Sequence, residues 1–265
     1  MRLLFWLAIL PSALLAARVL AYDRIEHEPV GLLIKIFIAG ALSCIPAAII
    51  ETLGEMGIAS VTDNRGLMAV LTYLLLVPIA EEGVKFAALN RVRRNPNFNY
   101  TFDGIVYGVM AALGFATLEN VLYVLDNMSI EVALMRGVLS VPLHCTCGVF
   151  MGYYYGVARG QEVRGVPSEA RRARKMAMLI PCIIHGVYDY SLATESASML
   201  VGGLIFTVFV FWMGARQVRV ASANDAPIMV SLESLTKPLP HEGFGLSSLV
   251  RGDGHRGTPP PPFNG

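Results

Sequence analysis

Charged and polar side chains interrupt the apolar segments of this 265-residue chain at four places. The first is VPIAEEGVKFAAL at 77–89, which holds Glu81, Glu82 and Lys85. Residues three and four apart lie on one face of a helix, so the Lys85 ammonium can reach either carboxylate. A charged side chain at membrane depth costs roughly 2.5 kcal/mol or more, so three of them within about one turn indicate a function.

Three more apolar segments carry such groups. FATLEN contains Glu119 and Asn120, and VPLHCTCG contains His144. PCIIHGVYDY contains His185 and Asp189, which are four residues apart, so that Asp189 can orient the imidazole. Taken singly, an ion pair, a packed histidine or an asparagine that bridges two helices explains each group. Together they are costly to bury separately, and we predict that they meet in one site.

A site of this composition suits hydrolysis of an amide bond. A carboxylate beside a second carboxylate, shielded from bulk water, can act as a general base near neutral pH. A nearby histidine can hold the attacking water or stabilise an oxyanion. The nucleophile motif GxSxG and the zinc motif HExxH are both absent from the sequence. A zinc site formed by His144, His185 and a carboxylate is compatible with the spacing, but the spacing does not require it.

The elements that must position these groups are membrane helices. Hydrophobic residues make up 54% of the chain and charged residues 15%, whereas about a quarter of a soluble domain is charged. Each apolar segment is near the ~20 residues that cross the hydrocarbon core. We therefore predict an all-α polytopic bundle of about seven spans around a polar cavity, in contact with lipid and with no nucleic acid. The predicted spans are 3–21, 30–50, 67–89, 102–125, 132–157, 176–194 and 198–214.

Small residues and prolines favour close packing and bends near these groups. Rows of glycine and alanine at four-residue spacing allow two helix backbones to approach. A proline frees a backbone carbonyl and bends its helix, which suits a water-holding cavity. Arg136 is expected to extend from the outer end of its span to the membrane surface. The rows are 104, 108, 112, 116 and 148, 152, 156, and the prolines are Pro78, Pro142 and Pro181.

The distribution of Lys and Arg predicts the orientation in the membrane. They concentrate in alternate connections, which places the amino terminus outside and the carboxyl terminus in the cytoplasm. We expect a membrane domain at 1–219 and a disordered, Gly-, Ser- and Pro-rich cytoplasmic tail at 220–265. The alternative is that residues 1–21 are a cleaved signal peptide. Arg18 interrupts the supposed cleavage region, and cleavage would invert every later loop against the charge bias.

The ordered motif set resembles a known family. EEGVK, FATLEN, an isolated histidine and HGVYD, within 67–194, are similar to the motifs of the PrsW-type intramembrane proteases, which are distantly related to the CAAX-prenyl endopeptidases. The resemblance implies that Glu81 and Glu82 supply a water-activating base and its partner. It implies further catalytic roles for Glu119, His144 and His185. It implies supporting roles for Lys85, Asn120 and Asp189.

The same resemblance implies a substrate, a location and two possible chemistries. Members of the family are described both as glutamic-type proteases and as metalloproteases, so either no cofactor or zinc is expected. Site-1 cleavage of a single-span anti-sigma factor is their best-known activity. A single-span membrane protein is therefore the implied substrate, and a bacterial inner membrane is the expected location.

Two other functional classes remain open from the residues alone. A proton- or cation-coupled transporter would use the same buried Glu, His and Asp side chains, although the chain shows no repeated halves. A seven-span receptor or scaffold would leave the buried charges unexplained. Cleavage of a co-expressed single-span reporter would distinguish a protease from both alternatives.

Overall fold

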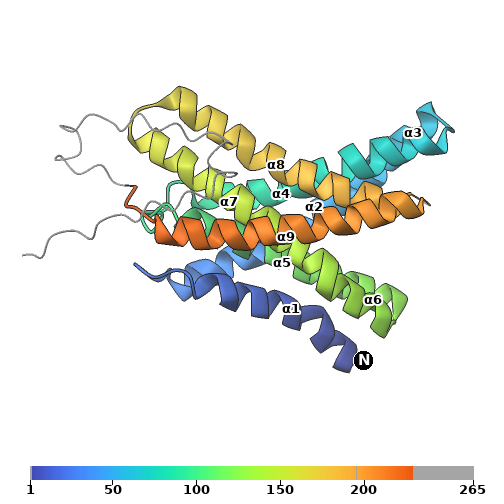
Figure 1. The fold of residues 1–265 in the computed structure, drawn as a ribbon, viewed down its shortest axis with the longest axis horizontal. Coiled ribbons are helices and arrows are strands. Elements are labelled where there is room, and N and C mark those ends of the chain that lie inside the picture. Colours follow the sequence, from blue (N-terminus) through green and yellow to red (C-terminus); the bar gives the residue numbers. More distant parts are fainter. Residues whose placement is uncertain (1, 195, 229–265) are drawn as a thin grey trace, which may run out of the picture. The chain divides into compact units, whose positions relative to one another are not determined.

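The computed structural model describes residues 2–194 and 196–228, and helices dominate that part of the chain (Figure 1). Seven helical stretches within it are long and apolar enough to cross a membrane, which confirms the predicted all-α transmembrane bundle. The elements are α1 (Arg2–Leu20), α2 (Val30–Val61), α3 (Arg65–Ala69), η1 (Val70–Leu76), α4 (Val77–Leu89), η2 (Asn90–Val92), α5 (Asp103–Asn127), α6 (Ile130–Met135), η3 (Arg136–Ser140), α7 (Val141–Val163), α8 (Pro167–Ala193) and α9 (Ala197–Ala223).

Helix α5 lies at the centre of the bundle because its small residues allow neighbours on two sides to approach. A Cβ atom added at Gly104 would lie 2.4 Å from the Gly152 carbonyl oxygen, and one added at Gly108 would lie 2.5 Å from that of Gly148. These contacts hold α5 against α7, as the two rows of small residues predicted. On the other side, a Cβ at Gly114 would lie 2.0 Å from the Phe37 carbonyl oxygen of α2.

Two helices begin with a widened, π-helical turn before a proline. Segments η1 and η3 end directly before α4 and α7, where Pro78 and Pro142 are the second residues. A proline has no N–H and its ring crowds the carbonyl four residues earlier, and a π-helical turn relieves that crowding. The amide N–H of Val77 accordingly bonds to the carbonyl of Thr72, five residues back. Both α4 and α7 carry predicted site residues about one turn after the proline.

Several spans extend beyond the predicted boundaries, and α8 and α9 are each nine residues longer at one end than predicted, since α8 begins at Pro167 and α9 ends at Ala223. Helix α2 continues to Val61, well beyond the predicted end at residue 50, and therefore includes Glu51. The fifth span runs from Ile130 to Val163. The extension of α2 places Glu51 within a membrane span, whereas the predicted span ended just before it. Arg136 lies within the fifth span, as predicted.

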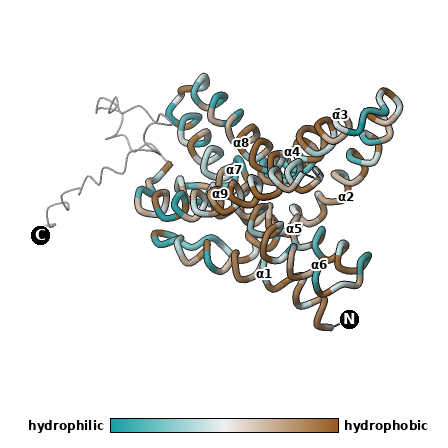
Figure 2. The backbone as a smooth tube through the Cα atoms, turned by 45° about the vertical axis from the view of Figure 1, so that its right-hand side comes forward, coloured by the Kyte–Doolittle hydropathy of each residue, from teal (hydrophilic) through white to brown (hydrophobic). Residues whose placement is uncertain are grey.

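The two ends of the bundle differ in their connections. The end of α1, the α7–α8 connection and the end of α9 lie together, opposite α3 and the α8–α9 connection (Figure 1). Hydrophilic residues gather toward the ends, and a further group lies near α4 inside the bundle (Figure 2). At the first end, Glu162 accepts a bidentate pair from Arg93 and also pairs with Arg174.

The chain after α9 continues into contacts with the α4–α5 loop. Thr101 donates its backbone N–H to Ala226 O, and Ile228 donates to Asn99 O. Of the tail expected at 220–265, residues 229–265 lie outside the described residues. Helix α1 is part of the bundle, since Ala8 packs with Val124 and Ala133.

Candidate active site

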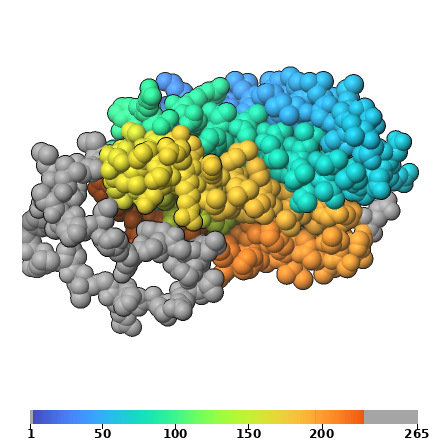
Figure 3. Space-filling view, turned by 90° about the horizontal axis from the view of Figure 1, so that it is seen from above, coloured from blue at the N-terminus to red at the C-terminus, as the bar shows by residue number. Residues whose placement is uncertain are grey.

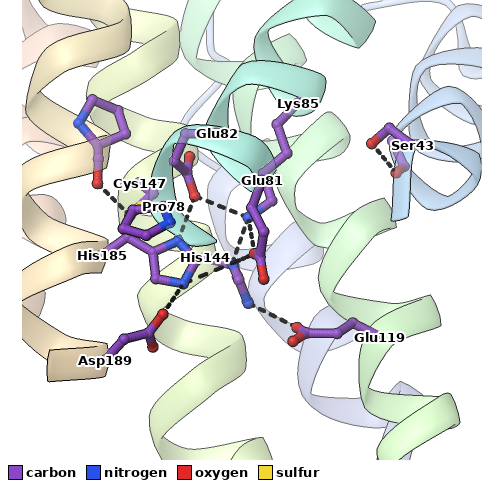
Figure 4. A network of polar contacts seen from close by, with 12 residues as sticks. Ser43, Pro78, Glu81, Glu82, Lys85, Glu119, His144, Cys147, His185 and Asp189 are labelled. Carbon is purple, nitrogen blue, oxygen red and sulfur yellow. Dashed lines mark hydrogen bonds and ion pairs between the residues drawn. The ribbon is translucent and has the colours of Figure 1, made fainter. Parts of the chain in front are cut away.

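A lysine ammonium lies at the centre of the polar groups (Figure 4). Lys85 is fully buried, and its Nζ lies 2.9 Å from Glu81 Oε2, 2.9 Å from Glu82 Oε1 and 2.8 Å from His144 Nδ1. The ammonium also lies 4.0 Å from the centre of the Phe115 ring, which adds a cation–π contact. Three polar partners and an aromatic face therefore hold one buried cation.

The hydrogen bonds of the two histidines differ, and so do their protonation states. His144 Nδ1 must accept from the Lys85 ammonium, so its Nε2 carries the proton and donates to Glu119 Oε2 at 3.0 Å. His185 Nδ1 lies 2.9 Å from Glu82 Oε1, and its Nε2 lies 3.2 Å from Asp189 Oδ2. Both of its partners are acceptors, so both ring nitrogens donate and His185 is an imidazolium. The rings lie edge to face, with centroids 5.1 Å apart.

The adjacent glutamates occupy different surroundings. Glu82 is completely enclosed, with Oε1 shared by Lys85 and His185, while its Oε2 is buried without a hydrogen-bond partner. Glu81 keeps a small exposed fraction, and its Oε2 lies 4.0 Å from His144 Nδ1 and 3.9 Å from His185 Nε2. Those two distances exceed a direct hydrogen bond. Glu81 is therefore the carboxylate with room for another group beside the imidazoles.

A second cation closes the site on the side of α5. Arg136 Nη2 lies 2.8 Å from Glu119 Oε2, its Nε donates to Asn120 Oδ1 at 3.2 Å, and its guanidinium stacks on Tyr123. The prediction that Arg136 extends to the membrane surface is wrong, because Glu119 and Tyr123 offer it better partners inside. The Asn120 amide donates to the Ala8 carbonyl of α1, so both its polar ends are engaged.

Close helix packing sets the position of His185. A Cβ added at Gly186 would lie 2.6 Å from the carbonyl oxygen of Leu74 in η1. Only a glycine allows α8 to come this near to the π-helical turn that precedes Pro78. The space-filling view shows α8 lying directly along the α3–α4 segment (Figure 3). This contact brings His185 within hydrogen-bond distance of Glu82.

The structure thus brings every predicted site residue into or beside one cluster, and it adds two that the sequence reading did not include. Arg136 is one of them. The other is Glu51 on α2, which makes no hydrogen bond or ion pair with the cluster among the described residues but interacts electrostatically with Glu119, Lys85 and His185. An intramembrane carboxylate is a recognisable signal in a sequence. It was missed because the predicted span ended at residue 50.

Comparison with known proteins identifies the family. Residues 28–214 match the model of a family described as "PrsW family intramembrane metalloprotease". Proteins named Protease PrsW from Bacillus subtilis and Clostridioides difficile are each 32% identical to this chain, over 80% and 79% of it and 93% and 87% of their own lengths. The chain belongs to the PrsW family. It is an intramembrane peptidase and an integral membrane protein, as the motif resemblance predicted.

A third relative is similar over most of its length, whereas no solved structure matches the chain significantly. Another Protease PrsW, from Geobacillus kaustophilus, is 32% identical over 83% of this chain and 92% of its own length.

The donors in this PrsW-family site fit a metal ion. One ligand atom from each of Glu81, Glu82, His144 and His185 lies within 4.8 Å of the others. Two imidazoles and carboxylate oxygens are ligands that zinc accepts, and the buried Glu82 Oε2 has a free lone pair. The Lys85 ammonium contacts three of these four residues, so it would compete with a metal ion for the same atoms.

Proposed function

We propose that this protein hydrolyses a peptide bond of a membrane-anchored, single-span substrate with water activated by Glu81. The observation that carries the proposal is the position of Glu81 Oε2, about equally far from the imidazoles of His144 and His185. At 3.9 Å from His185 Nε2, Glu81 Oε2 leaves space for a water molecule that donates to the carboxylate and accepts the imidazolium N–H shared with Asp189.

The reaction that fits this arrangement moves one proton through Glu81. The carboxylate takes a proton from the water as its oxygen bonds to the scissile carbonyl carbon. The same proton then passes to the leaving nitrogen as the C–N bond breaks. His185, held as an imidazolium by Glu82 and Asp189, offers positive charge to the oxyanion that forms between the two steps. Glu82 and Lys85 act by positioning their neighbours.

A zinc ion would be held by His144, His185 and one or both of the adjacent glutamates. When bound, zinc lowers the pKa of a coordinated water and polarises a carbonyl. The site residues named here would keep their positioning tasks in that case. Metal dependence is therefore a separate question from the identity of the residues, and a chelator tests it directly.

The proposal also includes the orientation of the protein in the membrane and the class of its substrate. We infer an amino terminus outside and a carboxyl terminus in the cytoplasm, because basic residues gather at the end of the bundle that holds Arg93, Arg159 and Arg174. The bacterial relatives support a bacterial inner membrane. The candidate substrate is a single-span anti-sigma factor cut at site 1.

The test is cleavage of single-span reporters by the purified protein in liposomes, with an anti-sigma factor among them. Glu81→Gln, Glu82→Gln and His185→Ala are compared with wild type and with Glu131→Gln, an exposed glutamate of α6. Cleavage should persist in the control and fall at least about a hundredfold in Glu81→Gln. Unchanged cleavage by Glu81→Gln would overturn its role as base. Loss of wild-type activity on chelation, restored by zinc, would assign the donors to a metal.

A further inference from the structure

One partly buried carboxylate of the bundle, Glu51, has no role in the proposed reaction. Glu51 follows Gly40, Cys44 and Ala47 on the face of α2 that is buried against the bundle. Cys44 and Ala47 pack with Phe115 of α5. Because α2 and α5 run side by side, the next turn of α2 brings Glu51 toward the turn of α5 that carries Glu119.

The Glu51 carboxylate has an unused acceptor inside the bundle. Its Oε1 is buried and has no hydrogen-bond partner among the described residues. Glu119 repels this carboxylate, whereas Lys85 and His185 attract it. A buried acceptor without a donor is unfavourable, and more so in a bilayer, where no bulk water can replace the donor. A donor that arrives with a ligand would remove that cost.

An apolar groove lies beside Ile50, the residue that precedes Glu51. It lies between α2 and the η1–α4 segment and has a volume of about 420 Å³. On each wall a lining residue is followed by a carboxylate, since Ile50 precedes Glu51 and Ala80 precedes Glu81. The rest of the lining is aliphatic and includes Ile58, Leu75, Ile79 and Val84. A hydrophobic segment that lies in this groove contacts the residues that immediately precede Glu51 and the proposed base.

A substrate that spans the membrane brings the missing donor. In a helix each backbone N–H is bonded within the segment, and the scissile carbonyl is shielded in the same way. Exposing that carbonyl to attack requires a local break in the helix, which frees backbone N–H groups inside the membrane. Each freed N–H then needs an acceptor from the protein.

We propose that Glu51 is a substrate-binding residue whose carboxylate accepts a backbone N–H of the unwound substrate segment lying in the α2/η1–α4 groove. This inference rests on the proposed proteolytic function. It assigns substrate recognition to a residue of α2, outside the four motif-bearing spans. It also predicts that the acceptor oxygen matters and the negative charge does not.

The test compares Glu51→Leu, which removes the acceptor, with Glu51→Gln, which keeps one. Glu55→Leu, an exposed position one turn further along α2, is the matched control. Kinetics are measured in liposomes on a reporter that wild type cleaves, and thermal unfolding verifies that each variant folds. We expect Glu51→Leu to raise KM about tenfold with kcat little changed, and Glu51→Gln and Glu55→Leu to resemble wild type.

Binding of the intact reporter to the Glu81→Gln protein separates this inference from the proposed function. Adding Glu51→Leu in that background should weaken binding by about the same factor as KM. An unchanged dissociation constant would overturn the inference, whether or not Glu81 is the base. Equal damage from Glu51→Gln and Glu51→Leu, with one limb of the pH–rate profile lost in both, would also overturn it and would assign proton transfer to Glu51. Cleavage that persists in Glu81→Gln alone would instead count against the proposed function.

Discussion

Within the part of the chain that the structure describes, two groups of largely buried carboxylates are stabilised in opposite ways. The central cluster, defined by Glu81, Glu82, Glu119 and Asp189, faces Lys85, Arg136 and the imidazolium of His185. The loop cluster, defined by Asp23, Glu28, Asp103 and Asp225, lies where the α1–α2 and α4–α5 loops meet the end of α9.

The loop cluster bonds to neutral donors. The Tyr107 hydroxyl donates to Glu28, and Asp103 Oδ2 accepts the backbone N–H groups of Asn99 at 2.9 Å and Tyr100 at 2.7 Å. Burial raises the pKa of the Asp23 carboxyl and also that of the Glu28 carboxyl, each above its ordinary value. These side chains hold the loops together, and binding a proton removes part of the free-energy cost of burying the carboxylates.

The difference shows which buried acids are suited to chemistry. Loop fastening needs only acceptors, so protonated or neutral groups serve nearly as well. The central cluster instead keeps ions facing one another inside a membrane. Burying these charges costs desolvation free energy, so their presence there indicates that the reaction uses them. The same residue types thus have separate roles, distinguished by whether their partners are cations or neutral donors.

Removing the central cation should have the largest effect. Lys85→Met leaves Glu81 and Glu82 adjacent with no buried ammonium between them. Breaking a buried ion pair from one side costs about 3–5 kcal/mol in the free energy of unfolding, and cleavage should be lost as well. Chemical unfolding in detergent measures the first, and the reporter assay the second.

The matched control is Lys35→Met on α2, where the lysine is exposed. Its unfolding free energy should stay within about 0.5 kcal/mol of wild type. Equal losses in the two variants would show that the central ammonium has no special role. The contrast between buried, paired charge and surface charge would then fail.

An intermediate effect is expected at the edge of the central cluster. Arg136→Gln removes the ion pair to Glu119, and both side chains are mostly buried. Hydrogen bonds to charged groups contribute about 1.5–3 kcal/mol, so the free energy of unfolding should fall by about 1–2 kcal/mol after allowance for residual solvent. Because Glu119 fixes the tautomer of His144, kcat should fall about tenfold.

Arg136→Lys sharpens this result. A lysine keeps the charge but has one nitrogen, so it cannot contact Glu119 and Asn120 together as the guanidinium does. Partial recovery of stability with kcat still depressed would support a geometric role. Full recovery of both would show that charge alone matters at this position.

The sequence predicted the bundle and most of the central cluster because membrane physics leaves few options. Long apolar segments must be helices, and charges within them must face inward and meet. Lys85 lies between Glu81 and Glu82 simply through helical spacing. The rows of glycine predicted the close approach of α5 and α7, which brings Glu119 to His144.

The rest depended on information that spacing does not contain. Arg136 had two plausible partners, the membrane surface and a carboxylate on a different helix, and only the packing of α5 against η3 decides between them. Glu51 was missed because hydropathy falls near residue 50 while the helix continues. The loop cluster joins segments that are far apart in the sequence, and no local pattern identifies such a contact.

The smallest predicted effect concerns the loop cluster and its response to pH. The pKa of Glu28 is raised in the folded protein, so the folded state binds the proton more tightly than the unfolded chain, whose Glu pKa is about 4.3. Stability from this group is therefore present at low pH and is lost as pH rises from that value through the raised pKa. Glu28→Gln has no proton to lose, keeps an acceptor for Tyr107, and should flatten this dependence.

Thermal unfolding of wild type and Glu28→Gln between pH 4.5 and 8 measures this difference. The two proteins should be similar at the acidic end and diverge toward pH 8, with the variant more stable there by less than about 1 kcal/mol. Titration of the central cluster affects both proteins alike and cancels in the comparison. Parallel curves would mean that Glu28 is ionised across the range. The loop cluster would then hold a carboxylate ion without a cationic partner. The presence of cationic partners would therefore no longer distinguish the central cluster from the loop cluster.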